Sequence, residues 1–214
     1  MDLLSRIPFS YTWIVRSITK SKFKTVLDLG CDRGDFMKGI SKDRRWEITG
    51  VELYEDSIKA AKDSGIYQKV IKGDITKLPK EVTGKKYDLV FCSQVLEHLA
   101  KNKGEKVLKQ WEKLAGKKIM VSTPKGFLPY EKIEIHKDEE NPHQQHLSGW
   151  QIREFSDRGY QVRGQGAVFI YGKNGIARRF PKLLPFFSLA SFIFAPLVYY
   201  FPQLATYLIA WKDK

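Results

Sequence analysis

The sequence contains few cysteines and none of the spacings that build disulfide or zinc scaffolds. Cys31 and Cys92 are the two cysteines in 214 residues, and each lies inside an apolar run. A disulfide framework and a CxxC metal knuckle are therefore excluded, and a reducing, cytosolic compartment fits best. The first residues include Asp2, and their apolar residues are interrupted by Pro8 and Arg16, which is unlike a secretory signal peptide.

Two common phosphate-binding motifs are also missing. The pattern G-x-x-x-x-G-K-[ST] does not occur, which excludes a P-loop. A dinucleotide fingerprint needs G-x-G-x-x-G, but after Gly30 the corresponding positions hold Asp32 and Asp35. At about 4 Å, two like charges repel by roughly 4 kcal/mol at an intermediate dielectric, so these acids would oppose a bound pyrophosphate. Together with Asp28, they predict a ligand that carries positive charge and no phosphate.

Acidic residues are scarce relative to basic ones. The chain has 24 Asp and Glu against 37 Lys and Arg, which gives a net charge of +13. Such an excess favours an anionic neighbour, which is a nucleic acid, a membrane surface or an acidic substrate. Alternatively, the basic residues form an ordinary solvated surface. The hydrophobic content of 43% suffices for a core, and the length suits one domain with a small extension.

Short apolar strands alternate with helical segments along most of the chain. This alternation predicts an α/β fold with a mostly parallel, doubly wound sheet covered by helices on both faces. Ligands of such sheets bind at the carboxyl ends of the strands, an edge that collects Asp28–Gly34, Glu52, Asp74 and Cys92–Gln94. The patterns predict strands over 24–30, 46–53, 67–75, 87–93 and 117–124, one or two closing strands over 160–172, and helices over 8–20, 35–42, 55–65, 105–115 and 148–159.

Residues 22–172 resemble the class I S-adenosylmethionine-dependent methyltransferases. "VLDLGCDRG" resembles the first motif of this family, with Asp28 as its acid and with Gly30 and Gly34 as its first and third glycines. Asp32 stands where the middle glycine is usual, and aspartate tolerates left-handed backbone angles better than most residues. The resemblance implies S-adenosylmethionine as the cofactor, a Rossmann-like seven-stranded sheet, and methyl transfer as the activity.

Three further motifs imply the remaining cofactor contacts. "GVELYEDSI" resembles the second motif, in which Glu52 would grip both ribose hydroxyls, and one carboxylate can accept two such hydrogen bonds. "KGDITKLP" resembles the third, where Asp74 would accept from the adenine amino group and Ile75 would donate its backbone N–H. "YDLVFCSQVLEHL" resembles the fourth, which covers the methionine moiety. The implied cofactor-binding residues are Asp28, Gly30, Cys31, Asp32, Gly34, Glu52, Leu53, Asp74, Ile75, Cys92, Ser93 and Gln94.

Candidate acid–base residues follow the strand over 87–93. Glu97 and His98 are well placed to act on a hydroxyl acceptor, which needs a general base; alternatively, Glu97 supports a helix N-terminus and His98 packs in the core. "QVLEHL" resembles the E-x-x-E-H magnesium motif of small-RNA ribose methyltransferases, but Gln94 replaces the first glutamate, and we expect no metal. The same segment lacks [DNS]-P-P-[YFW], which disfavours base N-methylation.

A polar stretch after the strand over 117–124 contains His136, His143 and His146. These side chains are interpreted as solvated loop histidines, although with the preceding pair they could supply a metal cluster. His146, as a third candidate catalytic residue, and Trp150 could instead line the acceptor pocket.

The last part of the sequence is strongly apolar. From Leu183 to Trp211 there is no formally charged residue. As one helix this run would measure about 43 Å at about 1.5 Å per residue, enough to cross a bilayer, but Pro185, Pro196 and Pro202 interrupt it. We expect a broken hairpin that dips into the membrane with both ends on the cytosolic face. The alternatives are a single kinked span, and two short helices packed on the core or across a dimer.

Together these features predict an N-terminal helix in 1–21, a methyltransferase domain in 22–175 and a hydrophobic, membrane-associating extension in 176–214. The expected function is methyl transfer to a hydroxyl of a hydrophobic or lipid-linked small molecule, by a cytoplasmic protein that is peripheral or monotopic on the membrane. The alternatives are an RNA (ribose) methyltransferase that uses the basic surface, and a cofactor-binding homologue without catalysis.

Overall fold

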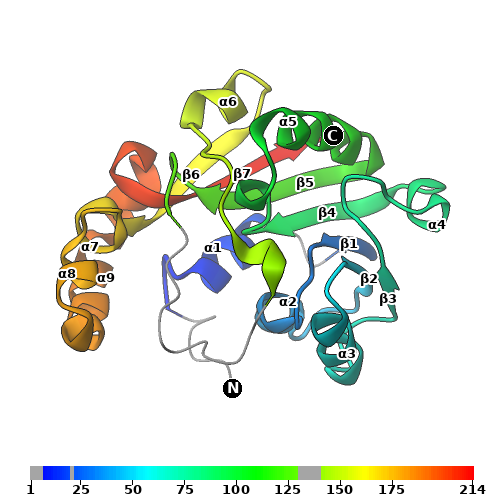
Figure 1. Ribbon diagram of the computed structural model, residues 1–214, viewed down its shortest axis with the longest axis horizontal. Helices are drawn as coiled ribbons and strands as arrows, with labels where there is room; N and C mark the ends of the chain where they lie inside the picture. Colours follow the sequence, from blue (N-terminus) through cyan, green and yellow to red (C-terminus); the bar gives the residue numbers. More distant parts are fainter. Residues whose placement is uncertain (1–6, 20–21, 130–140) are drawn as a thin grey trace.

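A seven-stranded sheet forms the centre of the computed structural model, which describes residues 7–19, 22–129 and 141–214. The strand order is β3-β2-β1-β4-β5-β7-β6 (Figure 1). The strands β1 to β5 run parallel, and β7 runs antiparallel to both of its neighbours. This architecture confirms the predicted Rossmann-like, mostly parallel sheet. The strands are β1 (Thr25–Leu29), β2 (Glu47–Glu52), β3 (Lys69–Lys72), β4 (Tyr87–Ser93), β5 (Ala115–Pro124), β6 (Gln161–Ala167) and β7 (Ala205–Asp213).

Helices cover both faces of this sheet. Successive residues of β1 point to opposite faces, so Val26 packs in the core on the side of α1 and α2, whereas Leu27 and Leu29 pack in the core on the side of α5 and α6. The α-helices are α1 (Tyr11–Ile18), α2 (Asp35–Ser41), α3 (Glu55–Asp63), α4 (Lys80–Thr83), α5 (Lys101–Leu114), α6 (Ile152–Ser156), α7 (Val168–Tyr171), α8 (Ile176–Arg179) and α9 (Leu184–Tyr200). Short 3-10 turns are η2 (Leu96–His98), η4 (Pro142–Gln144), η5 (Pro181–Leu183) and η6 (Pro202–Leu204).

The helix α5 begins four residues before the predicted start at 105. Its later turns carry the apolar stripe that predicts a helix, including the buried Leu108 and Trp111. The first turn contains Gly104, where an added Cβ would lie 2.6 Å from a ring carbon of the buried Trp150. The start of the helix therefore packs through the absence of a side chain, which a hydrophobic pattern cannot reveal.

The end of the chain belongs to the sheet, and this corrects the predicted boundary at residue 175. β7 lies between β5 and β6, with Ile209 paired to Ser122 on one side and to Arg163 on the other. Its side chains are buried on both faces of the sheet, which is why this interior strand has the same uncharged composition as the apolar residues before it. Of the one or two strands predicted over 160–172, one forms as β6, which stops at Ala167 and is followed by α7.

The remaining apolar residues form one helix rather than the expected broken hairpin. Pro185 lies in the first turn of α9, where its missing N–H leaves no partner unsatisfied, and the helix continues through Pro196. The segment Pro181–Tyr200 is long and apolar enough to qualify as a candidate membrane span by length and composition, and 11% of its most apolar window is buried. The excursion 168–204 thus leaves the sheet after β6 and returns to it in β7.

Gly164 tests how α9 is seated on the sheet. A Cβ at this position of β6 would lie 2.4 Å from the Val198 carbonyl oxygen of α9 and 2.6 Å from the Cβ of Ala205. Gly164→Ala should lower the free energy of unfolding by about 1–3 kcal/mol, as expected for overpacking, in urea denaturation followed by tryptophan fluorescence. The control is Gln161→Ala at an exposed position of the same strand, which should change stability by less than about 0.5 kcal/mol. Equal stability of Gly164→Ala and the unmodified protein would contradict this contact.

Candidate functional site

The turn after β1 adopts the left-handed backbone that a glycine motif provides. Gly30, Asp32 and Gly34 have φ angles of 68°, 45° and 89°. A Cβ at Gly30 would lie 2.5 Å from a methyl carbon of Val95, and one at Gly34 would lie 2.8 Å from the ring of Tyr67. Asp32 therefore takes the conformation of the middle glycine that it replaces, and the chain passes close to neighbouring side chains on both sides of it.

Three carboxylates gather around this turn. Glu52, at the end of β2, accepts the backbone N–H of Asp32 at 2.9 Å and those of Leu53 and Tyr54 at 2.8 Å and 3.0 Å. Asp32 accepts the hydroxyl of Ser57, the third residue of α3, at 2.5 Å. The predicted acids thus meet at one edge of the sheet, and Glu52 fixes the turn as well as facing the site.

Asp28 is the buried member of this group. It is 4% exposed and accepts the hydroxyl of Tyr67 at 2.7 Å. Burial, with a smaller contribution from the negative charges of Glu52 and Asp32, raises the pKa of its carboxyl to about 7. A cation bound beside Asp28 would reverse this effect, because an opposite charge favours the ionised form.

The third predicted motif lies on the same edge, after β3. Asp74 is exposed and its carboxylate accepts the backbone N–H of Thr76 at 2.7 Å, which closes a turn. The carbonyl of Ile75 accepts the indole N–H of Trp111 at 3.3 Å. Asp74 and Ile75 are therefore held in place by the turn and by α5.

The side chains of the two cysteines predicted to bind the cofactor are hardly exposed at this edge. Cys92 is fully buried in the core on the side of α5, and Cys31 is 6% exposed, beside Gly50. Burial raises the pKa of both thiols, so they remain protonated. What these two positions can offer a ligand is their backbone.

A polar cluster at the ends of β4 and β5 includes a residue that sequence reasoning missed. The hydroxyl of Tyr11, in the first turn of α1, lies 2.6 Å from the Ser93 hydroxyl and 2.9 Å from the Ser122 hydroxyl. The side-chain amide of Gln94 donates to Ser122 at 3.2 Å, and Gln94 itself has a φ of 55°. The helical pattern predicts α1, but the sequence gives no indication that α1 crosses this edge.

Glu97, His98 and His146 are brought together, as candidate catalytic residues should be. Glu97 is 1% exposed, accepts the Thr123 hydroxyl at 2.9 Å through Oε2, and has no hydrogen-bond partner for Oε1 within the described residues. Burial raises the pKa of this carboxyl to about 8. The rings of His98 and His146 are in edge contact, 4.9 Å apart. Glu97 is therefore mostly protonated near neutral pH, which makes it a poor base.

The two histidines have the properties of a neutral base. Nδ1 of His98 lies 3.2 Å from the carbonyl oxygen of Gln145, and Nδ1 of His146 bonds the carbonyl of Leu128. A carbonyl can only accept, so each Nδ1 carries the proton and each Nε2 keeps a lone pair. Burial lowers the pKa of both imidazoles, which keeps them neutral at pH 7.

The same three residues are the candidate metal-binding group in the part of the chain that the structure describes. One ligand atom from each of Glu97, His98 and His146 lies within 4.8 Å of the others, a set that suits a divalent cation as well as a base. His143 is exposed in η4 and outside this group, and His136 lies outside the described residues. Trp150 is fully buried, so it does not line the acceptor pocket as considered from the sequence.

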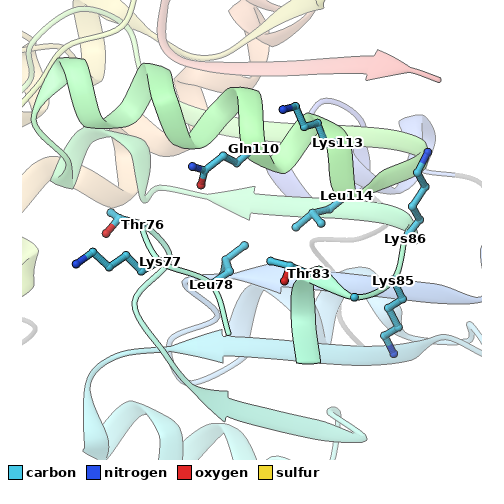
Figure 2. Close-up of a pocket in the computed structure, with 10 residues that line it drawn as sticks. Thr76, Lys77, Leu78, Thr83, Lys85, Lys86, Gln110, Lys113 and Leu114 are labelled. Atoms are coloured by element: carbon cyan, nitrogen blue, oxygen red, sulfur yellow. The ribbon is translucent and has the colours of Figure 1, made fainter. Parts of the chain in front are cut away.

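A separate groove lies between α4 and the end of α5 (Figure 2). It has a volume of about 800 Å³. Four lysines line it, all of them exposed. The groove is distinct from the carboxylate cluster and offers a positively charged surface. Its lysines are Lys77, Lys85, Lys86 and Lys113.

The raised pKa of Asp28 makes stability depend on pH. Because the folded-state pKa of about 7 exceeds the unfolded value, protonation of Asp28 favours the folded state. This contribution to stability is complete below about pH 4 and is lost as the pH rises through about 7. Asp28→Asn removes the titration, so its free energy of unfolding should fall less steeply over this window, by about 1 kcal/mol per pH unit. Urea denaturation of both cofactor-free proteins at several pH values measures the difference. Parallel pH curves would contradict it.

Comparisons with known proteins agree with this geometry. Residues 26–117 match a family described as a methyltransferase domain, a stretch that contains the glycine turn, Glu52, Asp74 and His98. Among curated proteins no sequence matches this chain.

Several solved structures are similar to the chain. A SAM-dependent methyltransferase from Archaeoglobus fulgidus has a TM-score of 0.58 and 17% identity, covering 98% of this chain and 97% of that chain. The plantazolicin methyltransferase BpumL in complex with SAH has a TM-score of 0.55 and 19% identity over 95% and 81%. The small RNA methyltransferase HEN1 has a TM-score of 0.56 and 17% identity over 99% of this chain and 25% of that one. At these identities the likeness shows the fold, and together with the matched domain it supports a class I S-adenosylmethionine-dependent methyltransferase.

Proposed function

We propose that this protein is an S-adenosylmethionine-dependent methyltransferase whose acceptor is a hydroxyl of a hydrophobic or lipid-linked small molecule at a membrane surface. The observation that carries the methyltransferase proposal is the group of three carboxylates around the left-handed turn Gly30–Gly34. Carboxylates suit a cofactor that carries a sulfonium and an ammonium, and they oppose one that carries phosphates.

The residues of this edge fit the cofactor. Glu52 uses one carboxylate oxygen for two backbone N–H groups and the other for one, and an ionised carboxylate has about four acceptor positions, so it retains capacity for a ribose hydroxyl. Asp28 would face the cationic part, and the turn leaves no room for a Cβ at Gly30. When bound, S-adenosylmethionine supplies an electrophilic methyl group on its sulfonium.

A hydroxyl acceptor loses a proton when it takes up the methyl group, and the chain offers a place for that proton. In the neutral rings of His98 and His146, Nε2 carries a lone pair, and both rings lie beside the mostly protonated Glu97. Either histidine would accept the proton as general base, while Tyr11, Ser93 and Ser122 keep a polar cluster over the neighbouring strand ends. This assignment agrees with the candidate catalytic residues Glu97, His98 and His146, with Glu97 as a neutral neighbour rather than a base.

The exposed surface supports the proposed acceptor class. The side of α9 that faces away from the sheet is apolar, with Leu189 and Ile193 72% and 78% exposed, and exposed apolar surface of this kind marks an interaction with a membrane or another molecule. An enzyme seated on a membrane is best placed to modify an acceptor that is already there.

The alternative acceptor is RNA, and the lysine-lined groove of Figure 2 favours it. Lysine contacts to phosphates would give binding that weakens steeply with salt. Salt-dependent RNA binding, without methylation of lipid extracts, would favour RNA over a lipid-linked molecule as the acceptor. Absence of S-adenosylmethionine binding in calorimetry would favour the non-catalytic homologue.

Glu52 provides the direct test of the cofactor site. Glu52→Ala should weaken binding of S-adenosylmethionine by more than about tenfold, because hydrogen bonds to the ribose and support of the turn are both lost. Glu52→Gln keeps an acceptor oxygen and should weaken binding less. Isothermal titration calorimetry measures both variants, and the exposed Glu47→Gln on the same strand serves as the control. An unchanged dissociation constant for Glu52→Ala would remove this residue from the cofactor site.

His98 provides the test of the base. His98→Gln should lower the rate of methyl transfer by about 100-fold or more and leave cofactor affinity unchanged. The assay is mass spectrometry of membrane lipid extracts incubated with the enzyme and methyl-labelled cofactor. His143→Gln, at an exposed histidine outside the cluster, is the matched control and should retain full activity. Full activity of both His98→Gln and His146→Gln would exclude a histidine base.

A further inference from the structure

An apolar stripe runs along the side of α9 that faces away from the sheet. It consists of residues spaced by three or four positions, which lie on one face of a helix. A solvent-facing helix carries polar residues on this face, so α9 lacks the surface that water requires. The stripe comprises Phe186 (67% exposed), Leu189 (72%), Ile193 (78%), Leu197 (48%) and Tyr200 (61%).

The opposite face of α9 is attached to the domain at its start, middle and end. Phe187 packs in a buried cluster with Ile170 and Ala177. The hydroxyl of Ser191 lies 3.1 Å from that of Tyr171, and Val198 is 1% exposed against β6. The helix therefore lies lengthwise against the domain, at the end of the molecule opposite α3 and α4 (Figure 1).

This attachment excludes a transmembrane orientation. A span must carry one end of the helix about 30 Å away from the other, across the hydrocarbon core. Here β6 precedes the excursion and β7 follows it, and the two strands pair directly, with Ala167 opposite Ala205. Crossing the bilayer would pull α9 off the buried cluster and off β6, so α9 meets a membrane only along its side.

The charge of the excursion favours an anionic surface. Residues 168–204 contain four basic residues, Lys173, Arg178, Arg179 and Lys182, and no Asp or Glu. Lys173, Arg179 and Lys182 are exposed and precede α9. Acidic headgroups would neutralise these positive charges, whereas a second copy of this segment would bring only further positive charge.

The end of α9 lies next to the end of β5, on the side of the site where Glu97 accepts a hydrogen bond from Thr123, which is the acceptor side under the proposed function. Lys125, which directly follows β5, donates its backbone N–H to Thr206 at 2.7 Å and its ammonium to the carbonyl of Gln203. The ring of Tyr199 lies 5.4 Å from that of Phe9, two residues before Tyr11. The end of α9 is therefore adjacent to the edge where β5 ends and α1 crosses.

We infer that α9 is an interfacial helix that lies in the plane of an anionic membrane leaflet, without crossing it, and holds the acceptor edge of the sheet against that leaflet. The inference rests on the proposed function only for what is delivered to this edge. The leaflet contact comes from the apolar stripe, and the preference for acidic lipid comes from the exposed basic residues that precede it.

Vesicle flotation tests the contact with the full chain. The protein should float with vesicles of phosphatidylcholine containing one third phosphatidylglycerol, and bind vesicles of phosphatidylcholine alone at least about tenfold more weakly. Leu189→Glu/Ile193→Glu should abolish flotation while the circular dichroism spectrum and cofactor affinity stay unchanged. Lys59→Glu on α3 changes the net charge by the same amount, −2, at the opposite end, and should still float. Equal flotation of the double variant would overturn the inference. Failure of the unmodified protein to float, together with a dimer in light scattering that the double variant dissociates, would also overturn it.

The orientation has its own readout. Fluorescent labels on introduced cysteines, at Ile193→Cys and at Phe127→Cys after β5, should be quenched by lipids carrying quenchers near the headgroup, with little quenching at Lys59→Cys. The native Cys31 and Cys92 are buried, and the unsubstituted protein corrects for any label that they take up. Strongest quenching of the 193 label by quenchers at the bilayer centre would indicate a span and overturn the inference. Equal quenching at 127 and 59 would overturn the placement of the acceptor edge.

The two proposals fail separately in these experiments. A protein that binds S-adenosylmethionine but does not float retains the methyltransferase function and loses the interfacial helix. A protein that floats but does not bind the cofactor retains the interfacial helix and loses the function.

Discussion

The antiparallel pairing of β7 between β5 and β6 is the constraint on which the rest of the structure depends. It brings the end of the chain back into the interior of the sheet, one strand from its edge, where Leu208 and Ile209 are fully buried. Because β6 and β7 are neighbours, everything between them must leave and return at the same end of the sheet. The position of α9, and the orientation that it imposes on any membrane contact, follow from this single pairing.

The cofactor edge depends on a second constraint, which is electrostatic. Asp28, Asp32 and Glu52 are held together by backbone N–H groups, the Ser57 hydroxyl and the Tyr67 hydroxyl. Such a group of acids is unfavourable without a cation, and the raised pKa of Asp28 expresses that repulsion together with burial. Around Glu97, His98 and His146 burial also disfavours charge, so that Glu97 is mostly protonated near neutral pH and the two histidines are neutral. The edge thus separates a negatively charged region from an uncharged one that is suited to take up a proton.

The sequence predicts local features of this fold well and distant contacts poorly. The alternation of strands and helices and the turn around Gly30 are encoded in neighbouring residues, and Glu52 and Asp74 are found because each follows a strand directly. Tyr11 could not be assigned, because its partners Ser93 and Ser122 are more than eighty positions away and no spacing rule connects them. The residues of β7 look like membrane residues, because a strand buried on both faces and a lipid-facing helix have the same apolar composition. The grouping of Glu97 and His98 with His146 could not be settled from the sequence either, because hydrogen bonds to Thr123 and Leu128, far away in the sequence, fix it.

The strand order also fixes a sequence of events during synthesis. Because a chain leaves the ribosome from its N-terminus, α9 emerges before β7 exists to pair with β5 and β6. For that interval the helix has an apolar surface on every side and no completed sheet to rest on. A nascent chain of this protein therefore has two ways to cover α9, a nearby lipid surface or a chaperone, until the last strand closes the sheet.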